Sequence, residues 1–126
     1  MELIIVLAII GILAGLAYPR YSQHLITARR AYATIALTDV AARLEQYYTQ
    51  NNSYAGATLE GLGVSDANYK NYYQLKITQA TTDQYTINAM PQNKQAQEDA
   101  GCGTLSLDQA GNKNITGSGK IEECWE

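Results

Sequence analysis

Few residues of this 126-residue chain are of types that do chemistry, and their spacing favours a covalent link over a reactive site. The two cysteines, Cys102 and Cys124, form no CxxC pair, and the single histidine, His24, is remote from both in sequence. A zinc site therefore lacks ligands, and His24 has no plausible Cys or Ser partner nearby. There is no glycine-rich phosphate loop, HExxH motif or calcium-loop pattern. We therefore expect no cofactor and no catalysis.

The two cysteines leave two interpretations open. In an exported protein they favour one disulfide, which the chain-entropy estimate values at about 3.4 kcal/mol for the loop they close. In a cytosolic protein they would be two free buried thiols.

One carboxylate, Glu2, stands at the head of an unbroken apolar run from Leu3 to Ala17. A membrane span needs roughly 20 apolar residues, so this run of about 15 is short, and a charge within it is costly unless paired. A signal peptide is the alternative, with Gly15-Leu16-Ala17 as small residues at a possible cleavage site. That alternative needs a basic start, which the chain lacks, and cleavage would cut a continuous helical pattern.

A helical pattern runs from Leu3 to about Asn52, which corresponds to roughly 75 Å of helix. A globular domain of this size cannot cover that length, so part of the helix must protrude. Gly11, Gly15 and Pro19 mark a place where the helix can kink or unwind, although such residues are also tolerated in ordinary membrane helices. Beyond Pro19, spacings of three and four predict one apolar stripe: Tyr21, Leu25, Ala28, Tyr32, Ile35, Ala36, Val40, Leu44 and Tyr47.

After an irregular connection over residues 49–71, rich in Asn, Ser and Gly, three segments alternate between apolar and polar residues. They are residues 72–79, 83–91 and 103–112, and the first two are joined as a hairpin. A small antiparallel sheet with one apolar face needs a cover, and the amphipathic second half of the helix supplies it. We therefore predict an α+β fold.

The charges are unevenly distributed. The net charge is −3; the four arginines lie in the first 50 residues, whereas the later part carries five lysines and nine of the twelve acids. This balance argues against general binding of nucleic acids, which relies on many phosphate contacts. The ten tyrosines could pack the seam between helix and sheet, or could make an adhesive face.

The first residues closely resemble a known family. The stretch "ELIIVLAIIGILAGLAYPRY", with its glutamate, its "AIIGILA" block and its "AYP" step, is similar to the N-terminal segment of type IV pilins. The later segments "RLEQYYTQNNSYAGATL", "CGTLSLDQAGNK" and "ECW" resemble minor pilins of the PilE kind in type IVa pili. The resemblance covers essentially the whole chain.

The resemblance implies a structural and priming minor pilin with the type IV pilin fold. Residues 1–20 would be a membrane anchor and filament-core segment, and residues 21–126 would be the pilin head with a C-terminal disulfide loop. Glu2 would pair with the N-terminal amine of a neighbouring subunit. The Gly11–Pro19 stretch would melt on assembly, and Cys102 and Cys124 would bound a surface loop.

The resemblance also implies partners and places. These are other pilin subunits in a helical filament, the inner-membrane assembly machinery, and a prepilin peptidase that would N-methylate the processed subunit. We expect a leader and the first mature residues of the family to precede Met1. The subunit would wait in the inner membrane with its head in the periplasm, and would support pilus assembly and thereby twitching motility, adhesion or DNA uptake.

Two alternatives stay open at this point. A type II secretion pseudopilin often carries a calcium site and usually lacks this disulfide, so the cysteine pair argues against it. A DNA-binding uptake pilin would need a basic stripe on its head, and the acidic balance of this head argues against that alternative.

Overall fold

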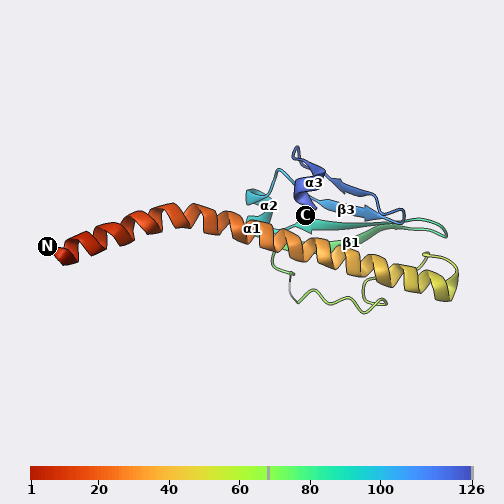
Figure 1. Cartoon of the computed structure of the whole chain (residues 1–126). Helices are drawn as coiled ribbons and strands as arrows, with labels where there is room; N and C mark the ends of the chain where they lie inside the picture. Colours follow the sequence, from red (N-terminus) through yellow and green to blue (C-terminus); the bar gives the residue numbers. More distant parts are fainter. Residues whose placement is uncertain (68, 126) are drawn as a thin grey trace.

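A single long helix lies along one face of a small antiparallel sheet, and its N-terminal part extends beyond the sheet (Figure 1). The computed structural model describes residues 1–67 and 69–125, with the backbone alone at residues 17–20. The elements are α1 (Glu2–Asn51), β1 (Tyr73–Ala80), β2 (Tyr85–Pro91), α2 (Asn93–Glu98), β3 (Leu105–Asp108), β4 (Lys113–Ile115) and α3 (Ile121–Cys124). The predicted α+β fold with a protruding helix is confirmed.

Helix α1 runs without a break for 50 residues. It ends where Asn52 adopts a left-handed conformation, with φ at 55°, and donates its backbone N–H to the carbonyl of Tyr48. Asn tolerates this conformation better than most residues, so it stops the helix where the chain must turn back toward the sheet. Among the residues of α1 whose side chains the structure describes, Ile26 is the first that is buried, and residues 1–16 are exposed throughout.

The predicted apolar stripe of α1 was partly wrong. Val40 and Leu44 are buried as expected, whereas Tyr21, Tyr32 and Ile35 are 62%, 54% and 65% exposed. The face that contacts the sheet is rotated relative to the prediction, with Ile26, Ala33, Leu37, Val40 and Leu44 buried on it. Two polar residues outside the predicted apolar stripe belong to the packed side, because Thr34 is buried and the Arg30 side chain is 11% exposed.

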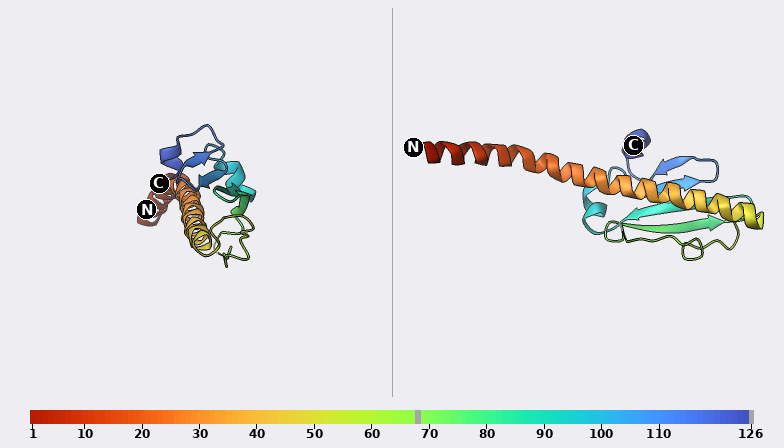
Figure 2. Two further views of the ribbon diagram at one scale, coloured as in Figure 1. Left: turned by 90° about the vertical axis from the view of Figure 1, so that its right-hand side faces the viewer. Right: turned by 60° about the horizontal axis from the view of Figure 1, so that its bottom comes forward.

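The four strands form one antiparallel sheet in the order β1-β2-β3-β4. The three strands predicted from alternation are present, including the β1–β2 hairpin, and their apolar residues line the inner face. Strand β4 and the short helices α2 and α3 were not predicted, since three to six residues carry too little periodicity to read. Figure 2 shows α1 across the inner face of this sheet.

The core is the layer between α1 and the sheet. The tyrosines contribute to it as the sequence suggested for the seam: Tyr54, Tyr69, Tyr73 and Tyr85 are buried, and the Tyr54 ring contacts the rings of Tyr48 and Tyr85 at centroid distances of 4.8 and 4.9 Å. The other buried members are Ala33, Leu37, Val40, Leu44, Ala57, Leu75, Ile87, Ala89, Cys102, Leu105, Leu107, Cys124 and Trp125.

Alkaline pH is expected to destabilise this core. Burial, the largest cause, raises the pKa of Tyr54, Tyr73 and Tyr85 to about 12 each. Unfolded tyrosines ionise near pH 10, so this stability is complete below about pH 10 and is lost as the pH rises toward 12. Thermal unfolding followed by circular dichroism between pH 9 and about 12 checks this, together with tyrosinate absorbance. Titration of all ten tyrosines near pH 10 in the folded chain would contradict it.

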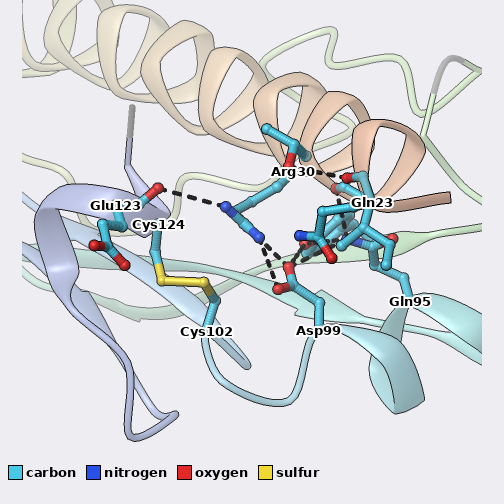
Figure 3. Close-up of polar contacts among 10 residues, drawn as sticks. Gln23, Arg30, Gln95, Asp99, Cys102, Glu123 and Cys124 are labelled. Atoms are coloured by element: carbon cyan, nitrogen blue, oxygen red, sulfur yellow. Dashed lines mark hydrogen bonds and ion pairs between the residues drawn. A yellow bond between two sulfur atoms is a disulfide. The ribbon is translucent and has the colours of Figure 1, made fainter. Parts of the chain in front are cut away.

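A buried polar network joins α1 to the sheet and to the C-terminal segments (Figure 3). The Arg30 guanidinium donates from Nε and Nη2 to the two carboxylate oxygens of Asp99, each at 2.8 Å. The Gln95 side-chain NH₂ group donates to the Ile26 carbonyl at 3.1 Å, to the Tyr73 hydroxyl at 3.1 Å and to Asp99 at 3.2 Å. No local pattern in the sequence predicts this network.

The disulfide between Cys102 and Cys124 is present, with 5.7 Å between the two Cα atoms. It connects the turn after α2 to α3, and backbone bonds from Gly117 to Cys102 and from Gly119 to Gly101 hold the same two segments together. A Cβ at Gly117 would collide with the backbone of Gly101, so only glycine allows this close approach. The interpretation as two free thiols is therefore wrong.

Candidate assembly surface of the long helix

The N-terminal part of α1 exposes a continuous apolar surface to solvent. We call residues 1–16 the arm. Its large apolar side chains are 52–74% exposed between Leu3 and Leu16, and α1 is long and apolar enough to cross a membrane. Soluble proteins rarely leave an apolar surface of this extent uncovered, so the arm requires a bilayer or other protein surfaces around it.

Glu2 lies at the first residue of α1 and is exposed. A carboxylate at this place is favoured by the unpaired backbone N–H groups of the first turn. Neither of the two ion pairs formed within the described part of the chain involves Glu2. The helix end therefore presents a carboxylate next to an apolar surface, and the predicted pairing of Glu2 with a neighbouring subunit stays a prediction.

Gly11 and Gly15 lie within the arm, and a Cβ at either position would meet only open space. Their lack of a side chain is therefore not required by packing within this chain. The Pro19 side chain lies outside the described residues. The predicted kinking or melting of the Gly11–Pro19 stretch stays a prediction, as does the division of the chain at residue 20.

Further exposed apolar side chains lie on the part of α1 that covers the sheet. Tyr32 and Ile35 project from the side of α1 that faces away from the core, and a groove runs along each side of Ile35. One groove, of about 280 Å³, is lined by Tyr32, Ile35, Ala36, Asp39, Val64, Ser65 and Tyr69. The other, of about 430 Å³, is lined by Thr34, Ile35, Thr38, Asp39, Ala42, Lys113 and Trp125.

These grooves are shallow, mostly apolar and parallel to a helix, which suits packing by a second helix. We call the arm together with Tyr32 and Ile35 the outer face. The 3–4 spacing predicts Tyr32 and Ile35 as part of the stripe that packs on the sheet. That prediction is wrong because the spacing identifies apolar positions without showing which side of the helix the sheet covers.

The basic residues of the chain are divided among several contacts. Arg30 binds Asp99, and Arg43 binds Asp39 at 3.0 Å and the carbonyl of Leu62 at 2.7 Å. Arg29 stacks on the ring of Tyr72 with 4.2 Å between its guanidinium carbon and the ring centroid. The five lysines lie on five separate segments, at positions 70, 76, 94, 113 and 120.

Comparisons with known proteins agree on one class. A family model described as "Type IV minor pilin ComP, DNA uptake sequence receptor" matches residues 19–106. The chain is similar in structure to the Neisseria meningitidis non-core minor pilin PilV, with a TM-score of 0.56 and 19% sequence identity over 77% of this chain and 92% of that one. At that identity the likeness shows the fold alone. No curated protein matches the sequence. Because the family match spans most of the chain, this protein belongs to the ComP family of type IV minor pilins.

Proposed function

We propose that this minor pilin acts as a structural and priming subunit rather than as an enzyme. The observation that carries the proposal is a single unbroken helix that is packed on a head at one end and wholly exposed and apolar at the other. The disulfide supports a non-catalytic role, since it leaves neither cysteine as a thiol nucleophile.

Before assembly, the arm would hold the subunit in the inner membrane with the head in the periplasm. The prepilin peptidase would act on the precursor. On assembly the arm would then leave the bilayer for a bundle of equivalent helices in the extracellular filament. Both surroundings are apolar, so the transfer keeps the arm out of water. Glu2 would be costly in that bundle unless paired, so pairing with a neighbour's N-terminal amine would fix axial position more than add stability.

We expect Ile35→Arg to lower the amount of this subunit in purified pili by about tenfold or more. Burying an unpaired charge costs several kcal/mol, and about 1.4 kcal/mol is already a factor of ten. Ile35 is 65% exposed, so the head should fold normally. Quantitative mass spectrometry of sheared pili, normalised to the total cellular amount of the subunit, measures the effect.

Thr49→Arg is the matched control, because it adds the same charge at an exposed position near the C-terminal end of α1. It should leave incorporation unchanged. Equal incorporation of the Ile35→Arg variant and the unmodified chain would refute a role for the outer face. Normal surface piliation and twitching in a strain that lacks the gene would refute the role in pilus assembly.

A second candidate function is reception of DNA during uptake. It is favoured by the family model, whose description names ComP as a DNA uptake sequence receptor. The charge distribution opposes it, since nine acids and five lysines follow residue 50 and the arginines Arg30 and Arg43 are engaged within the chain. A gel shift with duplex DNA and the detergent-solubilised chain at low salt decides the matter. Binding that weakens as salt rises supports reception, and no retention at low salt rejects it.

A role as a type II secretion pseudopilin receives no support. The family model and the similar structure are both minor pilins, and the disulfide that argued against a pseudopilin is present.

A further inference from the structure

The side of α1 that packs on the head contains one charged residue among apolar ones. Its positions follow spacings of four and three along the helix, so they form one continuous stripe. In order they are Ile26, Arg30, Ala33, Leu37, Val40 and Leu44.

Apolar packing alone specifies the axial position of such a helix weakly. Dispersion and hydrophobic contacts have no preferred direction, and the 3–4 spacing repeats along the stripe. A shift of α1 by one turn would place Leu37 where Ala33 lies and Leu44 where Val40 lies. Apolar side chains would still meet the sheet, at the cost of some overpacking.

The polar contacts around Arg30 distinguish one axial position from the others. We call Arg30, Tyr73, Gln95 and Asp99 the polar joint. The two 2.8 Å bonds between Arg30 and Asp99 need the two planar groups roughly coplanar and edge to edge, and the Gln95 amide reaches the main-chain carbonyl of Ile26. Hydrogen bonds of this kind fail when the partners move by more than about 1 Å, since a bond at 3.6 Å is no longer one.

The joint also gathers several elements at the place where α1 leaves the head. Arg30 donates from Nη1 to the carbonyl of Glu123, next to Cys124, at 3.4 Å. The backbone carbonyl of Asp99 accepts bonds from the N–H groups of Cys102 and Gly103. Figure 3 shows Arg30 between Asp99 and the C-terminal helix, with the disulfide beside it. The joint thus ties α1 to β1, α2 and both segments that the disulfide connects.

Buried ion pairs seldom add net stability compared with apolar groups of similar volume, and their best-attested use is to specify register. The joint bears a visible cost, because the side-chain oxygen of Gln95 is buried without a hydrogen-bond partner among the described residues. We propose that the polar joint is a register pin, with Arg30 as the positioning residue that fixes how far along α1 the head sits.

The consequence rests on the proposed role of the arm in a filament. One helical turn is about 5.4 Å, so a head bound one turn out of register would carry an arm longer or shorter by that amount. A neighbour that engages Glu2 would then meet the head, including the groove-lining residues Val64 and Trp125, displaced by one turn. The pin would give each subunit the same arm length.

The experiment measures the position of α1 on the head directly. Spin labels are placed at two exposed positions, Gln50→Cys at the end of α1 and Lys76→Cys on the sheet, in the full chain in detergent. Pulsed electron paramagnetic resonance should give one narrow distance for the unmodified joint. The double variant Arg30→Met with Asp99→Leu should keep its thermal stability and show additional distances, displaced by up to about 5 Å per turn.

The control breaks the other ion pair of the same helix by Asp39→Leu alone, which leaves the bonds from Arg43 to the carbonyls of Leu62 and Gly63 in place. That pair is exposed, with side chains 40% and 53% accessible, and the variant should keep the single distance. Gln95→Met, which removes three bonds and the unpaired oxygen, should also broaden the distribution.

The proposal would be overturned if the double variant Arg30→Met with Asp99→Leu, or the variant Gln95→Met, folds and keeps the single narrow distance. Failure of both variants to fold would also overturn it, because a pin that only selects register can be replaced by apolar side chains. The distances do not depend on pili, so a failure here is separate from a failure of the proposed role in assembly.

Discussion

Replacing Arg30 alone with alanine is expected to lower the free energy of unfolding by about 3–5 kcal/mol, the usual cost of removing one partner from a buried ion pair. The Asp99 side chain is only 7% exposed and would lose both 2.8 Å bonds to a cation while remaining away from water. The Gln95 amide and the Tyr73 hydroxyl would be its remaining partners. Urea unfolding followed by circular dichroism measures the change.

Asp39→Ala provides the comparison, since it breaks the ion pair that Asp39 and Arg43 form within α1. Its pair with Arg43 is exposed, and such pairs contribute about 1 kcal/mol or less. A loss below about 1 kcal/mol for Arg30→Ala would mean that Asp99 reaches water or another donor in the variant.

Loss of the disulfide is the second large effect we expect. Replacing Cys102 and Cys124 with alanine removes a link across 22 positions, for which the chain-entropy estimate is about 3.4 kcal/mol. Both sulfurs are buried, so small cavities should add to the loss. The same urea titration, with and without reductant, measures it.

The loss should be confined to the head. Reductant should destabilise the unmodified chain to the level of the alanine variant, and should leave the variant itself unchanged. The exposed arm should keep its helical circular dichroism signal in detergent throughout. Equal stability of the oxidised and reduced chains would show that the backbone pairs between residues 101–103 and 116–119 suffice to hold these segments.

The elements that could be predicted from the sequence are those with enough residues to show a periodic pattern of apolar positions. Fifty residues of helical periodicity can be read reliably, and so can three strands with alternating apolar residues. The membrane-like arm followed from composition alone, since the segment carries one charge before residue 17. The pairing of Cys102 with Cys124 followed from there being only two cysteines once export was accepted.

The short elements, and the side of α1 that packs on the sheet, could not be predicted in the same way. A helix with apolar residues on two sides, one for its own sheet and one exposed, has no single stripe to identify. The spacing therefore predicts Tyr32 and Ile35 as core residues, whereas the buried positions are Ala33 and Leu37. The exposure of Tyr32 and Ile35 is what makes the outer face a candidate for assembly.

What the sequence by itself determined is the long helix, its apolar arm, the sheet pattern and the disulfide, because each rests on periodicity, composition or the count of one residue type. What only the tertiary structure decided is which side of α1 the sheet covers, and that Arg30, Gln95 and Asp99 meet. The polar joint brings together residues 69 positions apart, Arg30 and Asp99, and no local pattern records a contact between segments so distant. Hydrogen bonds between such side chains exist only after the core has brought their elements together.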